Sequence, residues 1–146
     1  MNWYFKTFHE LTSLELFYIL QARSEVFVVE QNCPYLDPEE CDLFCIHVFA
    51  QDNNKIAAYL RIVPAGKKYK EVSIGRVLTT AQFRTEGYGR LMMKKAMDYI
   101  AGHMGESKVR ISAQAYLEEF YKSFGFCRVS EEYLEDNIPH VEMLFE

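Results

Sequence analysis

Two glycines one residue apart, placed between a strand-like run and a helix-like run, constrain this chain more than any other feature. The strand-like run EVSIGRVLTT covers residues 71–80, and Gly87 and Gly89 follow it. Beyond the glycines, apolar residues recur at helical spacing, namely Met92, Met93, Ala96, Met97 and Ile100. The sequence therefore predicts a strand, a glycine turn and the first turn of a helix in succession.

The first half of the chain predicts a helix followed by a hairpin. Thr12 and Glu15 have the spacing of a capping box, and the apolar residues after them predict a helix over 13–27. Two strand-like runs within residues 44–64 are joined by Asp-Asn-Asn at 52–54, a turn cluster that predicts a β-hairpin.

The second half of the chain predicts further strands and a short helix. In the strand of residues 71–80 the alternation of apolar residues slips at 75–76, which indicates a bulge. A short strand over 108–114, a short amphipathic helix within 115–126 and a terminal strand over 140–145 follow. Strands in pairs at both ends with helices between them predict a mixed α/β fold with helices packed on the faces of a central sheet.

Composition favours a single folded domain that spans residues 1–146. Of the 146 residues, 49% are apolar and 15% are aromatic, which differs from the composition of disordered chains. The apolar stretches are far shorter than the roughly 20 residues that span a bilayer, and the first residues lack the pattern of a signal peptide. We therefore expect a cytoplasmic protein with no membrane partner.

The net charge argues against nucleic acid as a partner, and the spacing of the cysteines argues against a bound metal ion. The formal net charge is −5, and no basic run is present, so nucleic acid is not an expected partner, whereas an acidic surface favours a cationic amine. Cys33, Cys41, Cys45 and His47 lack the two-pair spacing of a structural zinc site, so we expect no metal. We interpret these cysteines and Cys127 as free thiols.

The glycine turn predicts an anion site. The first amide groups of a helix lack hydrogen-bond partners and lie at the positive end of the helix dipole. Gly87 and Gly89 would let a pyrophosphate approach the backbone closely, and Arg84 and Arg90 would add positive charge. The turn has neither the third glycine of a dinucleotide-binding fingerprint nor the Gly-Lys-Ser/Thr of a P-loop. The alternative is that the glycines only begin the helix and bind nothing.

Two motifs, taken together, resemble those of a known family. Arg84, Gly87 and Gly89 form the pattern Arg-x-x-Gly-x-Gly after a strand, and Tyr121 precedes a Gly-Phe pair by four residues in AQAYLEEFYKSFGF. In this order the motifs resemble the cofactor-side segments of the GNAT superfamily of N-acetyltransferases. The segments ARSEVFVVEQNCPY, AYLRIV and IPH resemble its ElaA-like branch. The resemblance implies the GNAT fold, a mostly antiparallel mixed sheet with a splayed parallel strand pair and helices on both faces.

The resemblance also implies a binding site for acetyl-coenzyme A between the SIGRVLT and KVRISAQ strands. The site residues that it implies belong to the first strand, the glycine turn, the end of the second strand and the short helix. They are Val77, Leu78, Thr79, Arg84, Thr85, Glu86, Gly87, Tyr88, Gly89, Arg90, Gln114 and Tyr121. Gln114 stands where the family often has Asn, and it offers the same amide on a longer stem.

The chemistry of acyl transfer to an amine requires a proton donor, and either a base or a chain of water molecules that takes up the proton of the amine. A lysine-like amine has a pKa near 10.4, so under about 1% of it is neutral at pH 7 and a proton must be removed. A phenol at the sulfur can protonate the departing thiolate, and Tyr121 is the candidate. The candidates for the base are Glu30 and His47, with His140 and Glu142 on the terminal strand as alternatives.

Three functions remain open from the sequence. The first is an N-acyltransferase that transfers acetyl from acetyl-coenzyme A directly to a primary amine, as a monomer or homodimer. The second is a non-catalytic acyl-coenzyme A sensor on the same fold, and the third is an interaction protein whose glycine turn binds nothing. The acidic residues of the loop after the first helix could attract a cationic amine or could be solvated, and we favour the solvated loop; they are Asp37, Glu39, Glu40 and Asp42.

Overall fold

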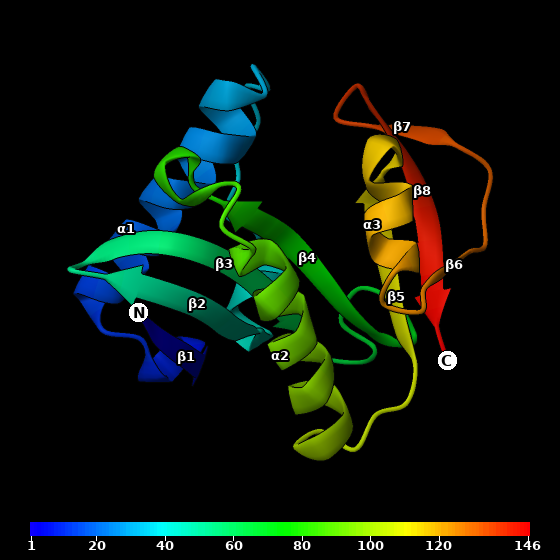
Figure 1. Ribbon diagram of the computed structural model, residues 1–146, viewed down its shortest axis with the longest axis horizontal. Helices are drawn as coiled ribbons and strands as arrows, with labels where there is room; N and C mark the ends of the chain where they lie inside the picture. Colours follow the sequence, from blue (N-terminus) through cyan, green and yellow to red (C-terminus); the bar gives the residue numbers. More distant parts are fainter.

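An eight-stranded mixed sheet forms the centre of the computed structural model, which describes residues 1–146 (Figure 1). The strands follow the order β1-β2-β3-β4-β5-β8-β6, and β7 pairs with β8 beside this path. Only β4 and β5 are parallel, which confirms the predicted mostly antiparallel sheet with one parallel pair. The strands are β1 (Asn2–Thr7), β2 (Ile46–Asp52), β3 (Lys55–Val63), β4 (Val72–Thr79), β5 (Val109–Gln114), β6 (Cys127–Arg128), β7 (Tyr133–Glu135) and β8 (Ile138–Phe145). The α-helices are α1 (Ser13–Arg23), α2 (Tyr88–Gly102) and α3 (Glu118–Lys122).

Side-chain alternation along β2 and β3 buries both faces of the sheet. Val48 and Leu60 face one side, where they belong to the same core cluster as the methionines of α2. Phe49 and Tyr59 face the other side and pack in a second cluster with Ile19 of α1. Because successive side chains of a strand point to opposite faces, two adjacent residues serve two separate cores. The helices therefore cover both faces, as predicted.

The predicted hairpin is formed by β2 and β3. Asn53 and Asn54 connect the strands with φ angles of +50° and +67°. Positive φ at both central residues is the signature of a type I′ turn, whose twist matches that of the strands, and Asn tolerates this conformation well. The Asn-Asn pair therefore determines the position of this turn.

The predicted bulge lies in β4. Gly75 pairs with Arg61 of β3, but Leu78 pairs with Tyr59, so β4 contains one residue more than the facing segment of β3. Arg76 lies inside the bulge with a φ angle of +50°. A bulge bends its strand and increases the local twist.

The bulged strand separates from its parallel neighbour. β4 and β5 pair only at their beginnings, where Val72 faces Val109 and Ser73 faces Arg110. Beyond these pairs the two strands diverge (Figure 1), while β5 stays paired with β8 as far as Gln114. The sheet is therefore split from its middle to one edge, and we call the space between the two strands the wedge.

The first helix begins as predicted but does not continue as an α-helix to residue 27. Thr12 accepts a hydrogen bond from the Glu15 N–H (3.0 Å), and the Glu15 carboxylate accepts one from the Thr12 N–H (2.9 Å), which confirms the capping box. The α-helix ends at Arg23, and the chain continues as a π-helix over Ser24–Glu30. In this wider helix Val26 still packs against the sheet, while Phe27 lines a cavity at the wedge.

The helix after the glycines is confirmed, and two strands, β1 and β7, lie outside the predicted set. α2 begins at Tyr88, directly after Gly87. β1 covers one edge of the sheet, and β6 and β7 both pair with β8. None of the helices combines the length and the hydropathy that a bilayer-crossing helix needs.

Candidate functional site

Two cavities meet at the wedge between β4 and β5. The first, here called the helix-side cavity, is lined by residues of α2, α3 and the π-helix. The second, here called the loop-side cavity, is lined by the segment after the π-helix, the β4 bulge and the β7–β8 turn. Residues that line both are Phe27, Gln31, Val77, Gln114, Leu117 and Tyr121. A ligand that enters one cavity would therefore reach side chains of the other.

The glycine turn at the helix-side cavity has the geometry of an anion site. Gly87 has a φ angle of +81°, and a Cβ atom added there would meet no atom within 4 Å. The first backbone bond of α2 runs from the Leu91 N–H to the Gly87 carbonyl (3.1 Å). The amide groups just before Leu91 therefore lack helical partners and lie beside open space. Gly89 lines the cavity, with Thr79 Oγ1 3.5 Å from an added Cβ.

The two arginines of the turn make contacts that the sequence does not indicate. Arg84 pairs with the Glu30 carboxylate at 2.5 Å and donates to the Thr79 carbonyl at 2.9 Å. Arg90 donates to Ser123 Oγ (3.1 Å), and its guanidinium also lies over the rings of Phe120 in α3 and Phe124 just after it. Arg84 therefore closes one side of the helix-side cavity, and Arg90 connects α2 to α3. The other predicted residues of the turn line neither cavity; they are Thr85, Glu86, Gly87, Tyr88 and Arg90.

Tyr121 lies where the two cavities meet. The residue is 6% exposed and lines both. Burial raises the pKa of its phenol well above the ordinary value, so the hydroxyl is protonated at neutral pH. Leu117 and Phe120, from the same short helical segment, line the helix-side cavity beside it. A protonated phenol in an apolar setting can donate a proton or a hydrogen bond to an anion that forms there.

The ends of β4 and β5 supply the remaining predicted residues of the helix-side cavity. Val77, Leu78 and Thr79 line the helix-side cavity from the diverging end of β4. Gln114 faces it from the end of β5, where it also pairs in register with His140 of β8. The structure therefore brings together the predicted strand residues, Arg84, Gly89 and Tyr121 at one cavity.

The four candidate bases occupy different environments. His47 lines neither cavity: it is 1% exposed, with its ring nitrogens 2.8 Å from the Tyr59 hydroxyl and 2.9 Å from the Asp42 carbonyl. Its burial lowers the pKa of the imidazole, and both ring nitrogens already have partners within the protein. Glu30 lines the helix-side cavity, but its carboxylate forms an ion pair with Arg84.

The two candidates on the terminal strand also differ. Glu142 pairs with Arg110 at 3.1 Å and lines neither cavity. His140 is 6% exposed and lines the loop-side cavity. Of the candidate bases, only His140 lies in the loop-side cavity.

Two of the four acidic residues in the loop after the first helix, Asp37 and Asp42, belong to a buried ion-pair network, whereas Glu39 and Glu40 are exposed, as expected of a solvated loop. Arg23 of α1 contacts Asp37 at 2.6 Å and Asp42 at 2.8 Å, and Arg61 of β3 contacts Asp42 at 2.8 Å. Burial alone would raise the pKa of Asp42, but its hydrogen bonds and charge interactions with the two arginines hold it well below the usual range. Arg76, in the β4 bulge, lies 2.8 Å from the Asp37 carboxylate. The network fixes the loop to the sheet beside the loop-side cavity.

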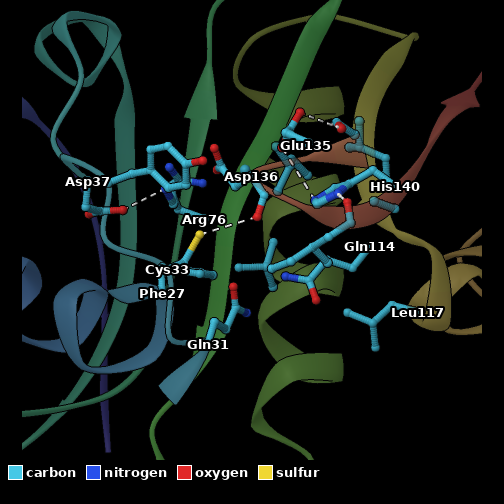
Figure 2. Close-up of a pocket in the computed structure, with 18 of the residues that line it drawn as sticks. Phe27, Gln31, Cys33, Asp37, Arg76, Gln114, Leu117, Glu135, Asp136 and His140 are labelled. Atoms are coloured by element: carbon cyan, nitrogen blue, oxygen red, sulfur yellow. Dashed lines mark hydrogen bonds and ion pairs between the residues drawn. The ribbon is translucent and has the colours of Figure 1, made fainter. Parts of the chain in front are cut away.

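Several cavity residues are not predicted from the sequence. Figure 2 shows Asp37, Arg76 and Cys33 on one side of the loop-side cavity, with Glu135 and His140 on the other. Local sequence gives no signal for the first three, because their positions depend on contacts between distant segments. Glu135 could have been found, since the Asp-Asn pair after it has φ angles of +53° and +61° and forms a hairpin turn.

The cysteines and other possible ligands form no metal cluster. Cys33, Cys41, Cys45 and Cys127 are free thiols, as the sequence indicates, and Cys33 donates to the Asp136 carbonyl at 3.4 Å. No group of three or more His, Cys, Asp or Glu side chains has the arrangement of a metal site.

Comparison with known proteins identifies relatives of this chain. A family model described as an acetyltransferase (GNAT) domain matches residues 45–146. Protein ElaA of Escherichia coli K12 is 41% identical over 136 residues, which cover 92% of this chain and 89% of that protein. The crystal structure of an acyl-CoA N-acyltransferase from Pseudomonas aeruginosa superposes with a TM-score of 0.94 at 38% identity, with 99% of each chain covered. The crystal structure of Escherichia coli ElaA gives a TM-score of 0.93 at 39% identity, with each chain fully covered.

Proposed function

Because this chain belongs to the GNAT family of acetyltransferase domains, and within it to the ElaA-like branch, we propose that it transfers an acetyl group from acetyl-coenzyme A to a primary amine. The family supports acyl-coenzyme A-dependent N-acyl transfer in general. The acetyl group and the primary amine are the specific part of the proposal. The observation that carries it is the position of Tyr121 between the two cavities of the wedge.

The helix-side cavity fits coenzyme A. Its glycine turn has open space at Gly87 and amide groups without helical partners, which suits a pyrophosphate. The separated ends of β4 and β5 offer backbone groups and the Gln114 amide to an extended amide-containing arm. Arg84, which pairs with Glu30, lies at the rim of the same cavity. We propose that the glycine turn and Arg84 hold the pyrophosphate. The separated strand ends and Gln114 would hold the pantetheine arm.

Acetyl-coenzyme A supplies an acyl group activated as a thioester. The loop-side cavity would admit the amine, so that its nitrogen meets the thioester carbon at the junction of the cavities. A C–N bond forms and the C–S bond breaks, and Tyr121 gives its proton to the departing thiolate. The nitrogen that has formed the C–N bond then loses a proton, and this proton passes to Tyr121 directly or through water, so that the phenol is restored. For an acceptor that enters as an ammonium ion, the products are an amide, a thiol and one proton.

Thiol release measured with a thiol-reactive dye tests this function. Wild-type protein with acetyl-coenzyme A and a panel of primary amines should release thiol only when a suitable amine is present, with the acetylated amine detected by mass spectrometry. Matched alcohols in place of the amines should release none. Tight binding of acetyl-coenzyme A without turnover of any amine would favour the sensor, and absence of binding would contradict both.

A further inference from the structure

The strongest unassigned arrangement is the pair of His140 and Glu135 in the loop-side cavity. His140 lies on β8 and Glu135 on β7, on either side of the tight turn that connects these strands. Figure 2 shows both side chains on the same wall of the cavity, with Gln114 beside His140. The proposed function needs a group that removes a proton from the amine, and the base remains unassigned.

The backbone determines which nitrogen of His140 can act as a base. Nδ1 lies 2.6 Å from the Ile138 carbonyl oxygen, which can only accept a hydrogen bond. Nδ1 must therefore carry the proton, and in a neutral ring the lone pair is on Nε2. The ring is also held by Tyr133, which stacks on it with ring centroids 6.2 Å apart. His140 is thus fixed in one tautomer and one orientation.

Nε2 of His140 faces a carboxylate. Glu135 Oε2 lies 3.5 Å away, and Glu135 Oε1 accepts a hydrogen bond from Ser112 Oγ at 3.1 Å. A lone pair and a carboxylate repel each other unless a proton or an N–H group lies between them. Protonation of His140 satisfies this requirement, and so does a ligand ammonium that donates to both groups. The Glu135 side chain is 38% exposed, so it is open to such a ligand.

The charges around the pair favour a cation. Asp37, on the far wall, already contacts Arg23 and Arg76, so its charge is compensated within the protein. Glu135 and Asp136 face the cavity without an arginine or lysine partner. Tyr133, Ser112, Gln114 and Tyr121, which also lie near His140, are neutral at pH 7, and the charge of Glu142, two residues along β8, is compensated by Arg110.

The geometry points to His140 as the catalytic base and to Glu135 as the group that binds the acceptor, which enters as a small primary ammonium ion. Glu135 holds the ammonium against Nε2, and Nε2 takes one of its protons. The resulting imidazolium is stabilised by the Glu135 carboxylate, and the neutral amine forms the C–N bond. His140 then releases its proton to solvent. This assignment rests on the proposed function, because it concerns the acceptor of the same reaction.

The binding step can be tested without turnover. Wild-type protein saturated with coenzyme A is titrated calorimetrically with n-butylamine or benzylamine, with n-butanol and benzyl alcohol as uncharged controls. The amines should bind, the alcohols should bind at least tenfold more weakly, and Glu135→Gln should lose most of this preference for the amine. The preference should survive in Glu131→Gln, at an exposed residue that lines neither cavity. Equal binding of amines and alcohols, or an unchanged preference in Glu135→Gln, would overturn the assignment of Glu135.

The catalytic step is tested with the best amine substrate from the thiol-release panel. His140→Gln should lower kcat/KM by about 100-fold at pH 7 and remove the limb of the pH profile that imidazole ionisation produces, with the affinity for acetyl-coenzyme A unchanged. His9→Gln, at an exposed residue that lines neither cavity, is the matched control and should behave as wild type. A retained pH limb in a folded His140→Gln would overturn the assignment of the base.

A second variant and a separate readout keep the inference distinguishable from the proposed function. Circular dichroism establishes whether His140→Gln folds; if it does not, Glu135→Gln at the more exposed site should still raise KM for the amine at least tenfold. An unchanged KM would overturn the inference. If the wild type does not bind acetyl-coenzyme A, the proposed function fails, whatever these variants do.

Discussion

Replacement of Tyr121 by Phe tests the proposed proton donor with a change of one oxygen atom. Tyr121 is 6% exposed, burial raises the pKa of its phenol, and no hydrogen bond contributes to that shift. Tyr121→Phe therefore keeps the ring packed in the core and removes no hydrogen bond that holds the fold. Loss of a hydroxyl that has no hydrogen-bond partner in the protein changes the free energy of unfolding by no more than about 1 kcal/mol.

The catalytic effect should be much larger than the effect on stability. General acid catalysis typically contributes about 100-fold or more, which corresponds to about 2.7 kcal/mol of transition-state stabilisation. Tyr121→Phe should therefore lower kcat at least 100-fold in the thiol-release assay, while the calorimetric dissociation constant of acetyl-coenzyme A changes less than about threefold. Because the phenol stays protonated through neutral pH, the decrease should be the same at pH 7 and pH 8.

An unchanged kcat in folded Tyr121→Phe would refute this reasoning. It would remove Tyr121 from the mechanism and leave water as the source of the proton. A loss of coenzyme binding without a change in kcat at saturation would show instead that the hydroxyl contributes to binding alone.

Two further substitutions test the packing around the site, by urea unfolding. Asp42→Asn leaves Arg23 and Arg61 without their buried anion and should cost about 3–5 kcal/mol at pH 7. The folded-state pKa of Asp42 lies below its ordinary value of about 3.9. The Asp42 carboxylate therefore contributes its full stabilisation above about pH 3.9 and loses it as the pH falls through the folded-state pKa. The free energy of unfolding of the wild type should decline below about pH 4, and that of the variant should decline less steeply. Equal acid sensitivity in both would contradict this. Gly125→Ala should cost about 1–2 kcal/mol or more, because φ is +101° and the new Cβ would lie 3.0 Å from the Phe145 ring, whereas the control Gly102→Ala meets no atom within 4 Å and should cost nothing.

Local signals in the sequence predict most of the fold that positions the site. The capping box at Thr12, the Asn-Asn turn of the hairpin and the glycine turn each act within a few residues, so their patterns identify the structure directly. The bulge at Arg76 is also visible, because it interrupts the alternation of apolar residues in one strand.

Features that depend on contacts between distant segments are not visible in this way. Asp37 and Asp42 look like residues of a solvated loop, and only the fold brings Arg23 and Arg61 to them. His47 has the residue type of a base, but its place in the chain does not reveal that β1 and β3 enclose it.

The same limit applies to the candidate acceptor site. His140 is a candidate from its residue type, whereas the orientation of its ring depends on the Ile138 carbonyl and on Glu135 across the turn. A two-residue turn with positive φ angles brings these groups together. Sequence therefore predicts the candidates, and the strand pairing distinguishes among them.

Calorimetric titration with acetyl-coenzyme A tests the central claim most directly. The wild type is compared with Gly87→Val, whose side chain would occupy the open space at the glycine turn, and with Gly66→Val as the matched control. Gly66 has a similar φ angle, +85°, and similarly open surroundings, so both variants carry comparable backbone strain, but Gly66 lies in the loop after β3 and not in the glycine turn. The account predicts binding to the wild type and to Gly66→Val, and its loss in folded Gly87→Val. Absence of binding to the folded wild type, or equal binding to all three, would contradict the assignment of the coenzyme site.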